Sequence, residues 1–334
     1  MSNATVQTKL PTNTFVWLLK REFWEYRGAF VRTPLIIACV MLSLVFFGLV
    51  VAQSTAQRHG VTISGIHLDE ITSKINPDAM EKFYAGFDLG LLSLAFPIGI
   101  GLFFVLFSYA TGALYNDRAD RSVLFWKSLP ISDTQTVLAK VVAASFMAPA
   151  LAVAGVIFLQ IGFLVLMSLY MILNGLNPAL LWSPTHLIAL WIKLIVLIPF
   201  NALWALPSLG WLLLVSSFVR SKPFLWGFML PFVAGVLVSV FKLTQELSLS
   251  SSWFWHYVVL RAVFSFVPGS WINFSELQEL RHEGDVHEVI SNLISFDAFG
   301  RLLASPNLWI GAVAGVAMIV AAIHFRRQRV ESYA

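Results

Sequence analysis

The sequence has little charge and only one cysteine. Asp, Glu, Lys and Arg make up 12% of its 334 residues, and 58% are hydrophobic. A soluble globular protein carries about a quarter charged residues. Cys39 stands alone, which excludes an internal disulfide and any site that needs two thiolates. This composition requires a covering of lipid, and it predicts a polytopic membrane protein.

The sequence patterns of several enzyme classes are missing. There is no Gly-Lys dipeptide and therefore no phosphate-binding P-loop, so we expect no ATPase site in this sequence. The Gly-x-Ser-x-Gly pattern of serine hydrolases is absent as well. The stretch HEGDVHE holds His282 and His287 five residues apart, whereas a zinc-binding helix needs a spacing of four. We expect a solvated loop there, and neither a metal, a cofactor nor a catalytic residue in the chain.

Six apolar runs are long enough to cross a bilayer, which takes about 20 mostly apolar residues per helix. The third and fourth runs exceed one span but are too short for two spans and a turn. We expect each to be one long helix, kinked at Pro149 or at Pro199 and Pro207. The predicted fold class is an all-α membrane protein with six transmembrane helices, at about residues 34–52, 89–114, 137–173, 187–219, 224–243 and 306–325.

The distribution of Lys and Arg predicts the orientation, because cytoplasmic segments of membrane proteins are enriched in both. With the N-terminus inside, about 14 of the 22 basic residues fall on the cytoplasmic side, but only about 6 of the 18 acidic ones. We therefore predict that both termini are cytoplasmic and that residues 53–88 and 244–305 are external. Topology explains the basic excess, and no basic stripe indicates nucleic-acid binding.

Two shorter segments are predicted as helices at the membrane surface. WFWHYVVLRAVFSFVPG (253–269), between spans five and six, is too short to span, and we expect it to dip into the membrane or to pack on the other spans. Residues 12–32 form an amphipathic helix in the cytoplasmic interface, the alternative being a cytosolic helix packed on a partner. Its apolar residues recur at helical spacing, and Arg21 forms an i,i+4 pair with Glu25 on another face. The recurring residues are Phe15, Leu19, Phe23, Tyr26 and Phe30.

The segment between spans two and three, residues 115–136, combines charges with large aromatic side chains. From Leu114 to Ser132 it reads LYNDRADRSVLFWKSLPIS, and Ser132 with Gln135 fits a capping box for the third span. A short helix is expected before that cap. One interpretation is a contact with a partner. The other is a lipid anchor, with Trp126 at the headgroups and the basic residues near anionic lipid.

The middle of every predicted span lacks Asp, Glu and His. Ion-coupled transporters use such residues for ion relays. If the protein moves a substrate, we expect the energy to enter from outside its membrane core.

In these segments and their order the chain resembles the membrane subunits of type-2 ATP-binding-cassette (ABC) exporters. The resemblance covers nearly the whole chain in architecture, but its specific part is the LFWKSLPIS region. It implies a second permease copy or a homologous permease, and two copies of a separate ABC ATPase that bind ATP and Mg²⁺. It also implies that residues 115–136 carry a coupling helix on which the ATPase docks. Phe125 and Trp126 would form the buried knob, and the rest of the interface would comprise Asp117, Arg118, Asp120, Arg121, Lys127 and Leu129.

The sequence therefore predicts a permease subunit in the bacterial inner membrane that exports a hydrophobic or amphipathic substrate such as a lipid, peptide or drug-like molecule. The alternative is a membrane scaffold or immunity-type protein that transports nothing. An intramembrane enzyme is disfavoured because the sequence lacks a polar catalytic constellation.

Overall fold

The computed structural model describes residues 14–58, 77–128, 131–182, 184–241, 251–271 and 295–328, and within these ranges it contains helices and no strand. The α-helices are α1 (Thr14–Arg27), α2 (Thr33–Arg58), α4 (Pro77–Ser93), α5 (Ala95–Gly112), α6 (Tyr115–Ala119), α7 (Ser122–Ser128), α8 (Asp133–Val142), α9 (Ala148–Leu173), α10 (Pro184–Phe218), α11 (Pro223–Phe241), α12 (Ser251–Phe254), α13 (Arg261–Phe264), α16 (Phe296–Ala304) and α17 (Pro306–Gln328). Three π-helical turns, η1 (Gly28–Arg32), η2 (Ala143–Met147) and η5 (Trp255–Leu260), and the 3₁₀ helix η3 (Pro178–Trp182) join them.

Six of the helical stretches are long and apolar enough to cross a membrane, which confirms the predicted number for the described residues. The chain is therefore built as a multi-pass membrane protein. These stretches extend beyond the predicted apolar runs at several ends, because polar turns continue the same helices. They are Thr14–Arg58, Gly86–Ala119, Asp133–Leu173, Leu187–Phe218, Pro223–Phe241 and Pro306–Gln328.

The long third and fourth runs are each one helical stretch, as predicted. In the third, η2 interrupts the α-helix just before Pro149, where the missing proline N–H prevents a regular hydrogen bond. In the fourth, α10 continues for 35 residues through Pro199 and Pro207. The predicted capping box is present, since the Ser132 hydroxyl accepts from the Gln135 N–H at 3.1 Å at the start of α8.

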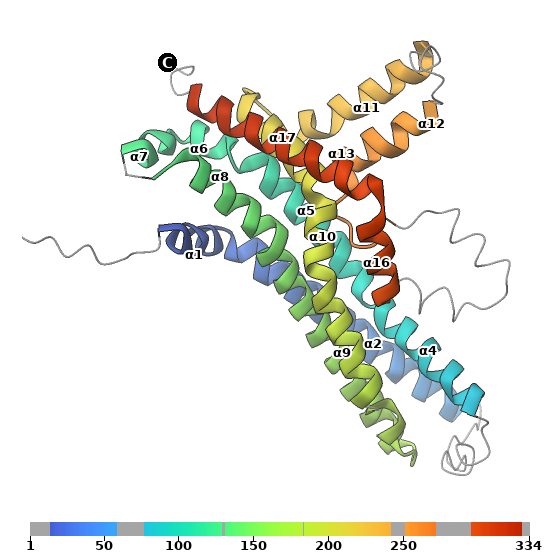
Figure 1. The fold of residues 1–334 in the computed structure, drawn as a ribbon. Coiled ribbons are helices and arrows are strands. Elements are labelled where there is room, and N and C mark those ends of the chain that lie inside the picture. The colour runs from blue at the N-terminus through green and yellow to red at the C-terminus, as the bar shows by residue number, and fades with distance from the viewer. Residues whose placement is uncertain are drawn as a thin grey trace, which may run out of the picture.

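The candidate interfacial helix and the first span form one continuous run. α1 passes through the π-turn η1 directly into α2, and the chain changes direction there (Figure 1). α1, α6, α7 and the C-terminal end of α17 lie at the same end of the bundle (Figure 1). We call this the α6–α7 end, and it gathers segments from all parts of the chain.

Helices α10 and α17 touch backbone to backbone. A Cβ atom placed on Gly315 of α17 would overlap the backbone at Leu206 and Pro207 of α10, and one on Gly210 would overlap the Gly315 carbonyl. Small residues allow such close approach between membrane helices. This contact holds α17 directly against α10.

Helix α11 and the α12 segment project to one side of the bundle (Figure 1). On α11 the buried residues are Gly227, Pro231 and Gly235, while most of its large apolar side chains are exposed. Lipid or another apolar surface must cover those side chains.

Candidate functional site

The start of α6 is fixed on the end of α10. The buried Ser216 hydroxyl accepts hydrogen bonds from the backbone N–H groups of Leu114, at 3.0 Å, and Tyr115, at 2.9 Å. Arg118 donates from Nη2 to the carbonyl oxygens of Ser216 and, at 3.1 Å, Val219. A helix end leaves N–H or C=O groups without partners, and a cation is favourable at a C-terminus. The segment that begins with α6 is therefore held on the end of α10 by hydrogen bonds at its first residues and at Arg118.

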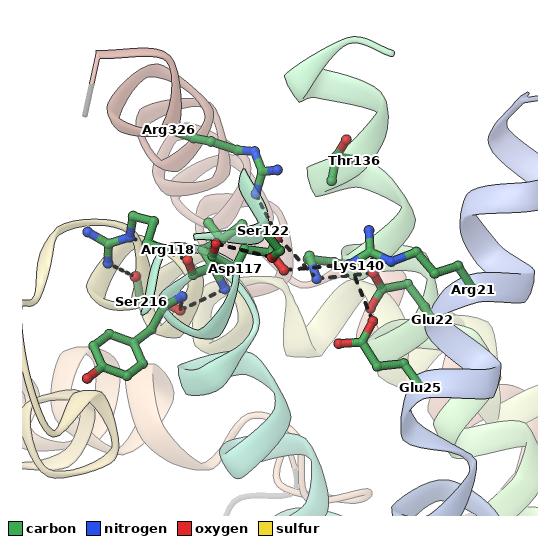
Figure 2. Close-up of polar contacts among 12 residues, drawn as sticks. Arg21, Glu22, Glu25, Asp117, Arg118, Ser122, Thr136, Lys140, Ser216 and Arg326 are labelled. Atoms are coloured by element: carbon green, nitrogen blue, oxygen red, sulfur yellow. Dashed lines mark hydrogen bonds and ion pairs between the residues drawn. The ribbon is translucent and has the colours of Figure 1, made fainter. Parts of the chain in front are cut away.

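The Asp117 carboxylate of α6 forms ion pairs with cationic side chains of three other helices. Its Oδ2 lies 2.9 Å from Arg326 Nη1 and 3.7 Å from Lys140 Nζ, and its Oδ1 lies 3.6 Å from Arg21 Nη2. Figure 2 shows these side chains converging on the carboxylate from α17, α8 and α1. The Asp117 side chain is 4% exposed, so these contacts replace water.

A second carboxylate, Glu22 of α1, is buried beside Asp117. Its Oε1 lies 3.0 Å from Lys140 Nζ, and its Oε2 accepts a hydrogen bond of 2.8 Å from the Tyr109 hydroxyl. The Glu22 and Lys140 side chains are 1% and 0% exposed. Arg326 extends the network on the other side, with Nε 3.0 Å from Asp133 Oδ1.

We name the six ionic residues the charge cluster: Arg21, Glu22, Asp117, Asp133, Lys140 and Arg326. Its three cations face these three carboxylates and a fourth, because Arg21 Nη2 also lies 3.3 Å from Oε2 of the exposed Glu25. Removing one partner from a buried ion pair typically costs about 3–5 kcal/mol, because the other charge stays buried without compensation. The cluster therefore requires α1, α6, α8 and α17 to keep their relative positions.

Helix α7 presents an apolar tip beside this cluster. Leu124 and Phe125 are 55% and 60% exposed, while Val123 is buried beneath them. Trp126 is half-buried, and the Arg21 guanidinium lies 3.9 Å from its ring centroid in a cation–π contact. The predicted aromatic pair therefore divides: Phe125 points to the outside, and Trp126 connects α7 to the charge cluster.

The predicted interface residues separate into two groups. Asp120, Arg121 and Lys127 are exposed and remain available to a partner. Asp117 and Arg118 were expected on the same rim, and this is wrong for the described structure because both are buried in intramolecular contacts. Leu129 lies outside the described residues.

The predicted amphipathic helix packs on this chain itself. Phe15, Leu19, Phe23 and Tyr26 are half-buried, and the Tyr26 ring packs edge-on against Tyr109 with centroids 4.6 Å apart. Two tryptophans of the helix face outward instead, Trp17 at 61% and Trp24 at 62% exposure. Large exposed aromatic side chains suit a membrane interface.

Sequence reasoning missed Glu22, Asp133, Lys140 and Arg326 as site residues. Lys140 and Arg326 are among the basic residues counted on the cytoplasmic side for the topology, and that count says nothing about ion pairs. Glu22 carried a signal, since it lies four residues from both Leu18 and Tyr26 and therefore on the apolar stripe of α1. A carboxylate on an apolar stripe indicates a buried partner.

A polar cavity of about 330 Å³ opens between α7, α8 and α17. Lys127 Nζ donates to the Arg327 carbonyl at 3.4 Å across it. The cavity lies between the C-terminal residues of α7 and two members of the charge cluster, and its lining residues are Trp126, Lys127, Ile131, Ser132, Asp133, Thr136, Arg326 and Arg327.

The HEGDVHE stretch lies outside the described residues. Within the described part of the chain, no group of three His, Cys, Asp or Glu side chains is arranged to hold a metal ion. Comparison of the sequence and structure with known protein families, curated proteins and solved structures finds no match.

Proposed function

We propose that the chain is the permease subunit of an ATP-driven exporter and that α7 is the docking element for a separate ATPase. The substrate would be a hydrophobic or amphipathic molecule, because the predicted spans are apolar and the middle of each described span lacks carboxylates and histidines. ATP and Mg²⁺ would be bound by the partner. Two permease subunits and two ATPase subunits would make up the complex.

The observation that carries the proposal is the position of Phe125. This side chain is 60% exposed at the tip of α7, while the base of the segment is held by buried ions from three other helices. An exposed aromatic side chain on a rigid support is suited to anchor an interface. Movement imposed on α7 would be carried into α1, α8 and α17 through Asp117.

The orientation proposed is that the α6–α7 end faces the cytoplasm of a bacterial cell, with both termini there. In the described residues this end carries Arg118, Arg121, Lys127, Arg326 and Arg327, which supports the assignment because cytoplasmic segments are rich in Lys and Arg. A reporter active only in the cytoplasm, fused after Ala334, would test it. Activity is expected, and an inactive C-terminal fusion would contradict the orientation.

Purification from native membranes in a mild detergent tests the partner. The tagged chain should retain a soluble polypeptide with P-loop sequence and ATPase activity, and Phe125→Ala with Trp126→Ala should reduce its recovery without lowering membrane insertion. Phe296→Ala is the matched control, because Phe296 is 62% exposed on α16, away from α7 (Figure 1).

Two outcomes would contradict the proposal. Absence of any ATPase from the purified complex would favour a non-transporting scaffold. Equal ATPase recovery with the double variant would favour a lipid anchor for the α7 aromatic side chains.

A further inference from the structure

A second charged feature lies on α13, in the short segment between α11 and α16, independently of the proposed ATPase. Arg261 is buried, with 9% of its surface exposed, whereas the apolar side chains of Leu260 and Phe264 beside it are exposed. This segment therefore turns its charge inward together with the buried Val259 and Val263, while other apolar side chains lie on its exposed face. That arrangement is typical of segments surrounded by lipid, where an inward-facing ionisable residue marks a functional position.

The Arg261 side chain is seated between α10 and α17. Its guanidinium carbon lies 4.0 Å from the centroid of the Trp204 ring on α10. On α17 it fills the space beside Gly311, where a Cβ atom would overlap the guanidinium. Gly311 therefore serves as the seat of the arginine, while Gly315, one turn later, makes the contact with the α10 backbone.

The backbone at this position is also fixed. The Ser208 hydroxyl of α10 donates to the Arg261 carbonyl at 2.8 Å and accepts from the Ser265 N–H at 3.0 Å. The Ser265 hydroxyl donates to the same carbonyl at 2.7 Å. The π-turn η5 ends immediately before Arg261, and such turns are frequent at functional sites.

Two of the three guanidinium nitrogen atoms are left without an acceptor in the described part of the chain. Within the described residues Arg261 Nε and Nη2 are buried and make no hydrogen bond or ion pair. Asn201, 3% exposed and one turn before Trp204 on α10, has a carbonyl oxygen without a donor among the same residues. An unpaired buried charge is costly. The two unpartnered nitrogen atoms therefore leave N–H donors that an anion can satisfy.

We propose that Arg261 binds the oxyanion, phosphate or carboxylate, of an anionic amphiphile, and that Asn201 accepts a hydrogen bond from a hydroxyl of the same headgroup. Arginine presents a planar fork of N–H donors that matches both oxyanions. The exposed side chains of Leu260 and Phe264 place the site where a molecule with an acyl chain can approach from the lipid. Binding would replace an unpaired charge with a charge-assisted pair.

Native mass spectrometry of the purified full chain in a non-ionic detergent tests the proposal. We expect one phosphatidylglycerol to bind per chain in preference to phosphatidylcholine, whose headgroup is zwitterionic. Arg261→Gln should weaken this binding about 10- to 100-fold, the effect of losing a hydrogen-bonded charge. Inorganic phosphate is then added as a soluble competitor of the lipid. If millimolar phosphate displaces phosphatidylglycerol, the site binds a free anion; if it does not, the site binds the lipid headgroup.

Two further variants separate recognition from folding. Gly311→Ala keeps the charge but fills its seat, so it should weaken binding as Arg261→Gln does. Arg301→Gln removes an exposed arginine of α16 and should leave binding unchanged. Each variant is compared only if it elutes as a single species on size exclusion. Arg261→Lys, which keeps the charge without the fork, provides an intermediate if Gly311→Ala fails to fold.

Either of two results would overturn the proposal. One is equal phosphatidylglycerol binding by the wild-type chain and Arg261→Gln. The other concerns residues 272–294, which lie outside the described ranges and contain five carboxylates. If lipid binds only after Glu276, Glu279, Glu283, Asp285 and Glu288 are replaced by their amides, the chain itself supplies the anion.

Discussion

Lys140 Nζ lies 3.0 Å from Glu22 Oε1, and neither side chain is more than 1% exposed. The pair joins α8 to α1 across more than a hundred residues of sequence. The Tyr109 hydroxyl completes it by donating to the other Glu22 oxygen at 2.8 Å. Two charges removed this completely from water are stable only together.

The first prediction concerns this pair. Lys140→Met should destabilise the protein by about 3–5 kcal/mol, because Glu22 and Asp117 then lose a buried cation. Adding Glu22→Gln should recover part of the loss, since the variant then buries one fewer uncompensated charge. The measurement is the fraction of monodisperse protein that survives heating in detergent.

Lys20→Met is the matched control for Lys140→Met. Lys20 is exposed on α1, and its Nζ lies 4.7 Å from the centroid of the exposed Trp17 ring. Its replacement should change stability by less than about 1 kcal/mol. Equal losses of stability in Lys20→Met and Lys140→Met would show that the buried Glu22–Lys140 pair does not stabilise the protein.

Sequence reasoning predicted the helices well and the charge cluster poorly. Apolar runs, the Ser132 capping box and the single long helices follow from local patterns, because hydrophobic length and capping act within a few residues. The pairing of Asp117 with Lys140 and Arg326 depends on which helices become neighbours. For the same reason the sequence predicts Asp117 and Arg118 at the surface, because charged residues in a loop are usually exposed to solvent. Only the tertiary packing reveals the cations around Asp117 and the carbonyl groups that accept hydrogen bonds from Arg118.

The second prediction concerns Arg326, which joins the C-terminal helix to both α6 and α8. Arg326→Gln leaves Asp117 and Asp133 with one cation fewer, so the ends of these helices should separate more often. Hydrogen exchange of the peptide covering residues 115–128 should become faster by at least about tenfold, the effect of 1.4 kcal/mol of lost protection.

Arg327→Gln supplies the comparison for Arg326→Gln. The Arg327 side chain is exposed and donates to the Thr134 hydroxyl at 3.2 Å. Exchange in residues 115–128 should then stay close to wild type. Unchanged exchange in Arg326→Gln would mean that the charge cluster does not hold α6 and α7.

The third prediction separates the two aromatic residues of α7. Phe125→Ala should leave thermal stability unchanged, because its ring is exposed, but should lower the recovery of the proposed ATPase. Trp126→Ala should cost about 1 kcal/mol of stability, because it removes the ring that lies 3.9 Å from the Arg21 guanidinium. Heating curves and co-purification are measured on the same preparations. Equal stability losses in the two variants would contradict the division of roles.

The fourth prediction tests the contact between α10 and α17. Gly315→Ala should destabilise the protein by about 1–3 kcal/mol. The added Cβ would overlap backbone atoms of Leu206 and Pro207, and backbone atoms cannot rotate away as a side chain can. Gly99→Ala on α5 is the control, because a Cβ there has no atom within 4 Å. Its effect should be neutral or stabilising by about 0.5–1 kcal/mol, because alanine is the better helix former. Survival of monodisperse protein after heating gives the comparison. If Gly315→Ala changes thermal stability in the same direction as Gly99→Ala, α17 must be able to move away from α10. The charge cluster at the C-terminal end of α17 would then have to tolerate that movement.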